Sequence, residues 1–192
     1  MCGIVALFSK QLNSEDLFFA KSALKNIAHR GPDNRSLINY SNRCILGHNR
    51  LSIIDLSKKS NQPMKNKDIS LVYNGMLYNY IELKKELEKK NYIFKTNSDT
   101  EVILNSYMEW GVSSFKKLRG MFSIVIYDLK RNEIIFSRDH LGIKPLYYKI
   151  NNKKIYVCSE IKPLTKLGKV KFNKKIIYNY LKFDFYETQE NT

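Results

Sequence analysis

The sequence predicts an α+β fold with largely antiparallel sheets. Segments with strand patterns come in clusters, and helical segments flank those clusters in groups. The regular strand–helix alternation that is typical of a parallel sheet does not occur. The chain has 192 residues, of which 43% are hydrophobic, and this length is enough for one domain with a sizeable core.

The first elements are predicted from apolar runs and helical spacing. Residues 3–8 are almost continuously apolar, which is typical of a buried strand. Apolar residues within 15–28 recur at the helical period, and Ser14 is the expected N-cap because its hydroxyl can accept a free N–H of the first turn. Two short strands are expected at residues 35–40 and 43–48.

The middle of the chain is predicted to contain one strand and two helices. The strand covers residues 69–73 and is expected to stop at Asn74-Gly75, which is a strong turn signal. Residues 79–90 place apolar side chains on one face and lysine and glutamate on the other, as an amphipathic helix does. A further helix is expected at residues 99–110.

The remaining elements are three strands and two short helices. We expect the strands at residues 121–128, 133–138 and 154–158, and the helices at residues 160–167 and 173–182. Neither an internal repeat nor a linker interrupts this order, so the sequence indicates a single domain.

The strong positive charge does not by itself indicate nucleic-acid binding. The formal net charge is +15, but lysines are scattered along the whole chain, in short clusters where solvated helix faces and turns are expected. No basic stripe with interleaved stacking aromatics is present, as single-stranded nucleic acid would require. We therefore expect no nucleic-acid partner.

The cysteines and apolar runs indicate a cytoplasmic protein without a metal site. Three widely spaced cysteines without a CxxC pair argue against both a disulfide framework and a zinc site, and the three histidines show no helical i, i+4 pairing. The apolar runs are too short to span a bilayer, and the N-terminus has no signal-peptide pattern.

Cys2 is the residue that most strongly suggests catalysis. Removal of Met1 would leave one residue with both a thiol and a free α-amine. The thiol can act as nucleophile, and the amine, with a reference pKa of about 7.7–8.0, can act as its general base. The alternative at this point is an incidental cysteine on an apolar N-terminal strand.

Further motifs carry a resemblance to a known family over nearly all of the chain. They are, in order, Met1-Cys2-Gly3-Ile4, His29-Arg30-Gly31-Pro32-Asp33, Gly47-His48-Asn49-Arg50-Leu51-Ser52-Ile53-Ile54-Asp55, Asn61-Gln62-Pro63-Met64, Tyr73-Asn74-Gly75, Ser98-Asp99-Thr100-Glu101 and Ser137-Arg138-Asp139-His140-Leu141-Gly142-Ile143-Lys144-Pro145-Leu146-Tyr147-Tyr148. Together they resemble the class II glutamine amidotransferase domain of glutamine-hydrolysing asparagine synthetases. This resemblance implies a four-layer αββα sandwich of two antiparallel sheets, the Ntn-hydrolase fold, over residues 1–192.

The resemblance also implies the reaction and its catalytic residues. Cys2 is similar to the nucleophile that attacks the side-chain amide of glutamine, releases ammonia and forms a γ-glutamyl thioester. Asn74 and Gly75 resemble an oxyanion hole, in which the Asn amide and the Gly N–H donate to the developing negative charge. The segment from Arg138 to Tyr148 is expected to serve the architecture and has no catalytic role.

The glutamine-binding residues follow from the same resemblance. Arg50 resembles the arginine that binds the α-carboxylate, since a guanidinium fork matches a carboxylate at two points. Asp99 resembles the acid that holds the α-amino group, and Asn74 and Gly75 also contact the substrate. The wall of the glutamine site is expected to be formed by Leu51, Ser52, Ile53 and Ile54.

Each of these positions also has a structural interpretation. Asn74-Gly75 is an ordinary turn signal after a strand. Arg50 could form an ion pair with Asp55, and Asp99 could act as the N-cap of the helix that follows.

Two features depart from the resembled family. Met76 stands where the family has a glutamate that helps to hold the substrate amine, and a thioether cannot pair with an ammonium. The ATP-binding synthetase domain, with its Ser-Gly-Gly-x-Asp-Ser type loop, does not occur in these 192 residues. We therefore expect a domain that is truncated at its C-terminal end, where residues 184–192 are polar.

The expected partners follow from that interpretation. Glutamine is the substrate, and a synthetase domain or subunit receives the ammonia for asparagine biosynthesis. We expect no cofactor in this chain, with ATP and Mg²⁺ needed only by the synthetase domain, and a homodimer is compatible with the sequence. The alternatives are an amidotransferase for another acceptor, such as a sugar or an antibiotic precursor, and a non-catalytic glutamine-binding domain.

Overall fold

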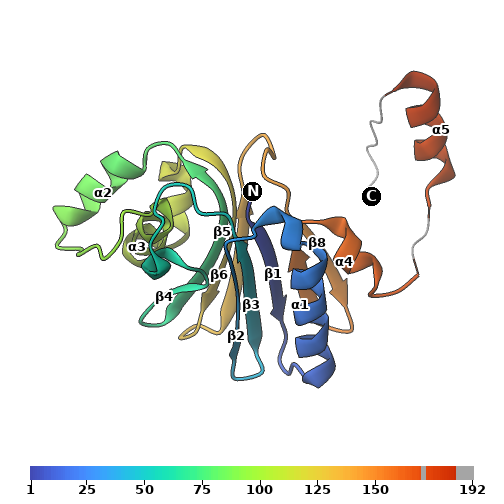
Figure 1. Ribbon diagram of the computed structural model, residues 1–192, viewed down its shortest axis with the longest axis horizontal. Helices are drawn as coiled ribbons and strands as arrows, with labels where there is room; N and C mark the ends of the chain where they lie inside the picture. Colours follow the sequence, from blue (N-terminus) through green and yellow to red (C-terminus); the bar gives the residue numbers. More distant parts are fainter. Residues whose placement is uncertain (170–171, 185–192) are drawn as a thin grey trace.

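The computed structural model describes residues 1–169 and 172–184, and within them the chain forms nine strands and five α-helices. The strands are β1 (Gly3–Phe8), β2 (Asn34–Tyr40), β3 (Cys44–Arg50), β4 (Met64–Asn66), β5 (Ile69–Leu77), β6 (Gly120–Asp128), β7 (Glu133–Arg138), β8 (Tyr147–Asn151) and β9 (Lys154–Cys158). The helices are α1 (Ser14–Asn26), α2 (Tyr80–Glu88), α3 (Asp99–Trp110), α4 (Ile161–Thr165) and α5 (Lys174–Phe183) (Figure 1).

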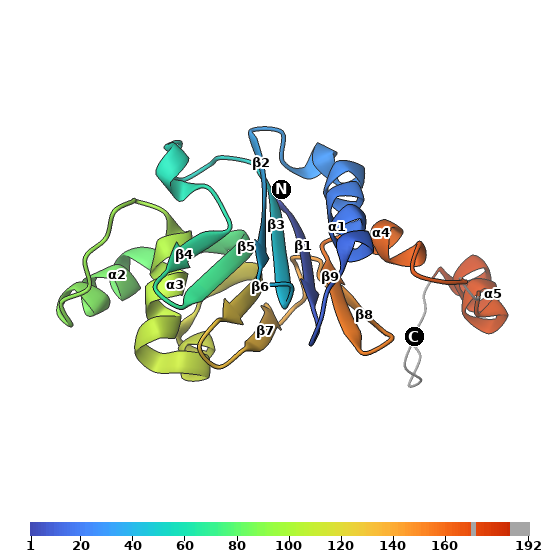
Figure 2. The same cartoon turned by 90° about the horizontal axis from the view of Figure 1, so that it is seen from below.

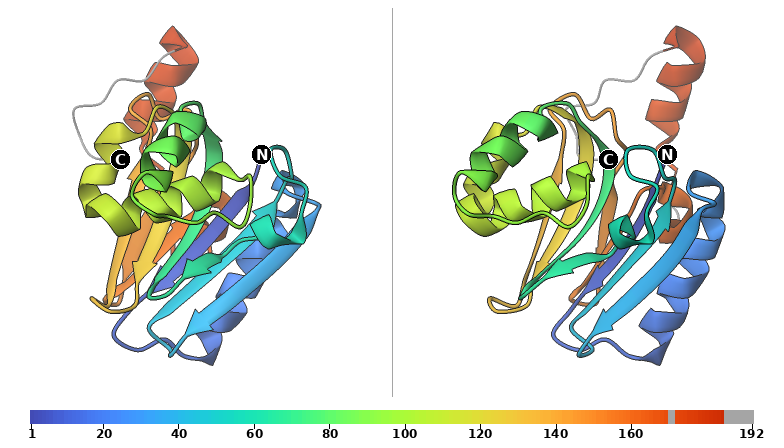
Figure 3. Two further views of the ribbon diagram at one scale, coloured as in Figure 1. Left: turned by 90° about the vertical axis from the view of Figure 1, so that its left-hand side faces the viewer. Right: turned by 60° about the vertical axis from the view of Figure 1, so that its left-hand side comes forward.

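The strands form two antiparallel sheets that lie between two layers of helices. The five-stranded sheet has the order β2-β3-β1-β9-β8, and the four-stranded sheet has the order β4-β5-β6-β7. Helices α1 and α4 cover the outer face of the first sheet, and α2 and α3 cover the outer face of the second (Figures 2 and 3). The predicted αββα sandwich of antiparallel sheets is therefore confirmed.

The alternation of side chains along each strand explains why the layers pack in this order. On β1, Ile4 and Ala6 belong to the apolar cluster between the sheets, whereas Val5 and Leu7 belong to the cluster beneath α1. All four are fully buried, so this strand reads as a continuous apolar run. Because β1 is central in its sheet, the residue that precedes it is fixed at one end of the sandwich.

The prediction that Asn74-Gly75 ends a strand is wrong. Strand β5 continues through both residues to Leu77, and Gly75 lies opposite Phe122 of β6. A Cβ on Gly75 would lie 2.3 Å from the backbone oxygen of Met121, so the glycine permits a close approach of strands. Pairing along the whole of β6 has overridden the local turn preference.

Other differences concern element ends and short strands. The N-cap of α1 is Asn13, not Ser14, because the Asn13 side chain accepts from the N–H of Asp16 at 3.1 Å while the Asp16 carboxylate accepts from the N–H of Asn13 at 2.8 Å. The sequence did not predict β4, which is only three residues long, or β8, whose side chains are mostly exposed. The polar end of the chain, residues 185–192, lies outside the described residues.

Among residues 1–169 and 172–184, no helix combines the length and apolar character that crossing a membrane requires.

His48 links the two sheets from a fully buried position on β3. Its Nε2 lies 3.0 Å from the backbone oxygen of Tyr73 on β5. Because a carbonyl oxygen can only accept, Nε2 carries the proton of a neutral ring. Burial lowers the pKa of His48 from its ordinary value to about 4, so the ring is neutral at neutral pH.

We expect this histidine to make folding sensitive to mild acid. The unfolded chain binds a proton at His48 below about pH 6.5, whereas the folded chain resists it until about pH 4, so stability falls as the pH drops through this window. Lowering the pH from about 7.5 to 5 should cost about 2 kcal/mol of unfolding free energy at this site. Urea unfolding of the parent and of His48→Gln at both pH values tests this, because the pH-dependent loss should be smaller in the variant by that amount. An equal loss in both proteins would contradict the assignment.

Candidate active site

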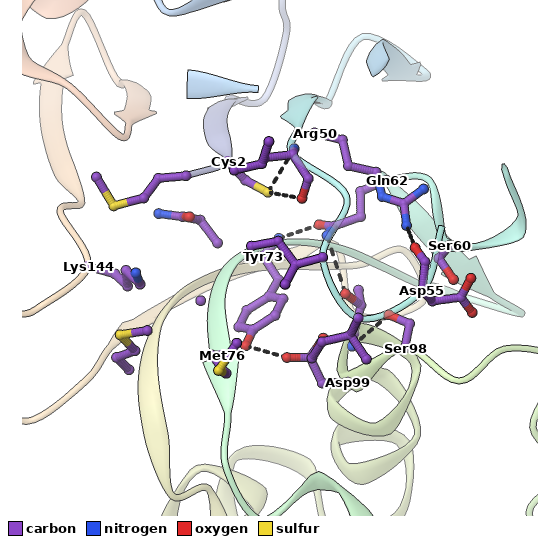
Figure 4. A pocket seen from close by; sticks show the side chains of 18 residues that line it. Cys2, Arg50, Asp55, Ser60, Gln62, Tyr73, Met76, Ser98, Asp99 and Lys144 are labelled. Atoms are coloured by element: carbon purple, nitrogen blue, oxygen red, sulfur yellow. Dashed lines mark hydrogen bonds between the residues drawn. The ribbon is translucent and has the colours of Figure 1, made fainter. Parts of the chain in front are cut away.

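A cavity of about 220 Å³ lies at the end of the sandwich where β1 begins. Its walls come from both sheets, from the loop after β3 and from the start of α3 (Figure 4). The structure thus brings together nearly all the predicted site residues, although they are far apart in the sequence. Those that line the cavity are Cys2, Arg50, Leu51, Ile53, Ile54, Asn74, Gly75 and Asp99.

Cys2 is held at this cavity through its backbone and its sulfur. Gly3, the first residue of β1, pairs with Asn49 of β3, and Arg30 Nε donates to the backbone oxygen of Cys2 at 2.9 Å. The Sγ atom lies 3.4 Å from the nitrogen and 3.6 Å from the oxygen of Leu51. These contacts fix the direction in which the sulfur faces the cavity.

The thiol needs a base before it can attack a substrate. Burial raises the pKa of Cys2, and this effect outweighs the opposing influence of the Leu51 N–H, the N-terminal ammonium and Arg50. Met1 also lines the cavity, so the terminal amine that its removal would expose belongs to the cavity wall. A neutral amine there is a suitable proton acceptor.

Arg50 is oriented by a set of hydrogen bonds at the end of β3. Its Nη1 donates to the backbone oxygen of Ser57 at 2.9 Å and to Asn61 Oδ1 at 2.8 Å, and its Nη2 donates to the backbone oxygen of Asp55. Within the described part of the chain, Nε has no partner. The alternative of an Arg50–Asp55 ion pair is wrong, because the Asp55 carboxylate accepts from the N–H groups of Ser57 and Asn97 instead.

The loop after β3 forms one wall of the cavity, with one exception to the prediction. Leu51, Ile53 and Ile54 line the cavity, whereas Ser52 does not. The N–H of Ser52 donates to the Asp33 carboxylate at 2.7 Å, outside the cavity. The placement of Ser52 in the glutamine wall is therefore not supported by this geometry, since a contact with the turn after α1 holds its backbone there.

Asn74 presents an amide nitrogen that no group of the described chain satisfies. The residue lies on β5 and is 2% exposed, and its Nδ2 is buried without a hydrogen-bond partner. Leaving a buried donor unpaired costs about 1–3 kcal/mol, so such a group indicates a bound ligand or water. Gly75 follows it along the same wall.

Asp99 is the first residue of α3, and its carboxylate is turned toward β5. Its Oδ2 accepts from the hydroxyl of Tyr73 at 2.8 Å and from the N–H of Leu77 at 3.1 Å. The alternative of an N-cap role is wrong, because Ser98 is the N-cap and its Oγ accepts from the N–H of Thr100 at 3.0 Å. Burial raises the pKa of Asp99, which a neighbouring ammonium would lower again.

Some residues of the cavity were not predicted from the sequence. Gln62 accepts from the N–H of Tyr73 at 2.6 Å and donates to Thr100 Oγ1 at 3.3 Å, and it thereby ties the loop to β5 and α3. Lys144 and Met121 also line the cavity. Gln62 and Lys144 lie within the motifs quoted above, which was the available signal, whereas nothing in the sequence marks Met121.

The arrangement suits a ligand that carries both a carboxylate and an ammonium. Arg50 supplies a cation and Asp99 an anion on one side of the cavity, while the sulfur of Cys2 faces the same space (Figure 4). Among residues 1–169 and 172–184, no cluster of three or more His, Cys, Asp or Glu side chains is placed to hold a metal ion.

Comparison with known proteins gives a consistent result. Residues 1–192 match the family described as glutamine amidotransferase domain. The chain is 38% identical over 193 residues to glutamine-hydrolyzing asparagine synthetase 1 of Bacillus subtilis (strain 168), in an alignment that covers 96% of this chain and 30% of that protein. It is 39% identical over 170 residues to asparagine synthetase B (glutamine-hydrolyzing) of Escherichia coli (strain K12), covering 85% and 30% of the two proteins. The chain thus spans less than a third of the length of these two relatives.

Solved structures agree on the fold. The glutamine phosphoribosylpyrophosphate amidotransferase of B. subtilis superimposes with a TM-score of 0.71 at 20% identity, over 86% of this chain and 43% of that chain. The Ntn-hydrolase-like fold expected from the sequence is therefore confirmed.

Proposed function

The chain belongs to the glutamine amidotransferase domain family, and from this premise we propose that it hydrolyses glutamine to glutamate and ammonia with Cys2 as the nucleophile. The observation that supports this most directly is that Asn74, which lines the cavity together with Cys2, has a buried Nδ2 without a hydrogen-bond partner in the described chain. A buried donor beside a nucleophile is what acyl transfer requires, because negative charge develops on the attacked carbonyl oxygen.

Binding of glutamine uses the two charged poles of the cavity. Arg50 holds the α-carboxylate, for which its Nε is available, and Asp99 holds the α-ammonium. The hydroxyl of Tyr73 keeps the Asp99 carboxylate in place from the other side. The side-chain amide of glutamine then extends toward Cys2, and the remote groups of the substrate contribute the binding energy that orients it.

The chemistry proceeds through a thioester. The α-amine of Cys2 takes the thiol proton as Sγ attacks the amide carbon, and the side-chain amide of Asn74 and the N–H of Gly75 donate to the oxyanion. The amine returns the proton to the leaving nitrogen, the C–N bond breaks and ammonia departs. A water molecule then attacks the γ-glutamyl thioester, which releases glutamate and restores the thiol.

The relatives support a proposal about the use of the ammonia. We propose that a synthetase domain or subunit receives it for the ATP-dependent synthesis of asparagine from aspartate, as the names of the two asparagine synthetases suggest. ATP and Mg²⁺ would act only there, and glutamine hydrolysis in this chain needs no cofactor. Three free thiols are compatible with the reducing cytoplasm as the site of the reaction.

The function is tested by assaying the purified chain for ammonia release from glutamine, with mass spectrometry to show whether Met1 has been removed. Protein that starts at Cys2 should release ammonia, whereas protein that retains Met1 should be inactive because its amine is displaced by one residue. Equal activity of the two forms would rule out the terminal amine as base. Inactivity of correctly processed protein that binds glutamine would favour the non-catalytic alternative.

Met76 is expected to limit the affinity for glutamine. It lies opposite Met121 in the β5–β6 register, and both thioethers line the cavity, so neither can hold an ammonium. We expect Met76→Glu to lower KM for glutamine about tenfold with little change in kcat, because a hydrogen bond to a charged group contributes about 1.5 kcal/mol or more. Steady-state kinetics measure this, with Met76→Gln as the uncharged control. An unchanged KM in Met76→Glu would mean that the substrate amine does not approach this position.

A further inference from the structure

Lys144 lines the cavity but has no part in the reaction as proposed above. The residue is 8% exposed. Within the described part of the chain, its ammonium makes no hydrogen bond, ion pair or ring contact, although both of its backbone groups are hydrogen-bonded. The side chain as a whole is buried, but its unpaired ammonium is not among the fully buried polar atoms of the described chain, so a ligand in the cavity can reach it. Its partner is therefore to be sought in the ligand of the cavity.

The loop between β7 and β8 is built to hold this lysine in place. The Asp139 carboxylate accepts from the N–H groups of Phe122 at 3.1 Å, Ile143 at 2.8 Å and Lys144 at 3.0 Å. Arg138 Nε donates to the backbone oxygen of Lys144 at 2.7 Å. Both polar groups of the Lys144 backbone are thus fixed to Arg138 and Asp139 at the end of β7, and a functional side chain needs this kind of support.

The position of Lys144 separates it from the other charges of the cavity. In Figure 4 it lies across the cavity from Arg50, Asp55 and Asp99, with Cys2 between the two sides. Both carboxylates already accept hydrogen bonds from their own neighbours, Asp55 from the N–H of Asn97 at 2.9 Å and Asp99 from the hydroxyl of Tyr73 at 2.8 Å. Lys144 is therefore on the side of the cavity away from the groups that would hold the α-carboxylate and the α-ammonium.

Negative charge appears on this side only as the reaction proceeds. The side-chain amide of glutamine is neutral, but both tetrahedral intermediates carry an oxyanion, and the product glutamate carries a γ-carboxylate. We propose that the ammonium of Lys144 stabilises these anionic species at the amide end of the cavity, an inference that rests on the proposed glutamine hydrolysis. A cation in this position favours the transition state and the product over the neutral substrate.

This role has a distinctive kinetic signature. Lys144→Met removes the charge but keeps a long unbranched side chain. It should lower kcat about tenfold and weaken inhibition by glutamate about tenfold, while KM for glutamine changes less than about twofold. Lys144→Arg should keep kcat and glutamate inhibition within about threefold of the parent, because it restores the charge.

A second measurement does not depend on glutamine turnover. Iodoacetate and iodoacetamide are both expected to alkylate Cys2. They differ in that iodoacetate carries a negatively charged carboxylate where iodoacetamide carries a neutral amide. A nearby cation accelerates only the anionic reagent. The rate of Cys2 alkylation by iodoacetate, divided by the rate with iodoacetamide, should therefore fall about tenfold in Lys144→Met and stay near the parent value in Lys144→Arg. Mass spectrometry of Cys2 measures both rates. Lys21→Met is the matched control, because Lys21 is exposed on α1 and its loss changes the net charge equally. That control should leave the ratio unchanged.

The outcomes separate this inference from the proposed function. A ratio that stays within twofold of the parent in Lys144→Met, or that falls equally in Lys144→Arg, overturns the role of the Lys144 charge. If thermal denaturation shows that Lys144→Met is not folded, Lys144→Gln is used in its place, and the same results are expected of it. If the parent protein does not hydrolyse glutamine at all, the proposed function fails, and the alkylation ratio still decides whether Lys144 acts on anions beside Cys2.

Discussion

Replacing Cys2 with alanine should lower glutamine hydrolysis by at least about 1000-fold. The substitution removes the only protein atom that forms a covalent bond to the substrate in the proposed mechanism, so no thioester can form. The Arg50–Asp99 pair is untouched, and Cys2→Ala should still bind glutamine. Ammonia release measures the loss, and calorimetry of glutamine binding shows that the cavity has remained intact.

The matched control is another thiol of the same protein. Cys158 is fully buried on β9, and burial raises its pKa to about 12, so it cannot supply a thiolate. Cys158→Ala also removes a thiol, but from the core. It should keep kcat within about twofold of the parent while lowering the thermal stability. Hydrolysis by Cys2→Ala at the rate of the parent protein would end the proposed mechanism, whatever the behaviour of the control.

The sequence was sufficient for individual strands and helices where a clear apolar pattern marks them, whereas the four-layer arrangement followed from the family resemblance. The apolar run of β1 and the helical spacing of α3 leave few alternative structures, and both elements lie where they were expected. Prediction from the sequence failed where pairing with a distant strand determines the local conformation. Asn74-Gly75 reads locally as a turn, and only the partner strand β6 keeps it extended. The exposed side chains of β8 likewise give no period that a sequence could display.

The site divides in the same way. That Cys2, Arg50 and Asp99 belong to one site was predicted from their chemical types at recognisable motif positions, and the three residues do line one cavity. The partners that orient them could not be predicted, since the contact of Tyr73 with Asp99 joins residues 26 positions apart. Lys144 stands in a motif that was assigned to architecture, and its backbone does serve the architecture. Its side chain lines the cavity only because β7 ends beside it, which a sequence read alone does not reveal.

Replacing Asn74 with alanine is expected to lower kcat about 100-fold or more with a small change in KM. Its Nδ2 has no partner within the described part of the chain, so the substitution breaks no hydrogen bond of that atom. The substitution also removes a buried donor whose desolvation destabilises the folded state. We therefore expect the melting temperature of Asn74→Ala to stay level or to rise. An activity loss without a stability loss is the signature of a group that is kept for its ligand.

Asn26 provides the comparison that makes this test selective. Its Nδ2 is likewise buried without a partner, but it lies at the end of α1 and does not line the cavity. Asn26→Ala should therefore leave kcat unchanged, whereas Asn74→Asp, which replaces the donor with an acceptor that repels an oxyanion, should lose more activity than Asn74→Ala. If Asn74→Ala loses stability and activity together, the amide supports the strand. If both asparagine variants keep full activity, the oxyanion is stabilised elsewhere in the cavity.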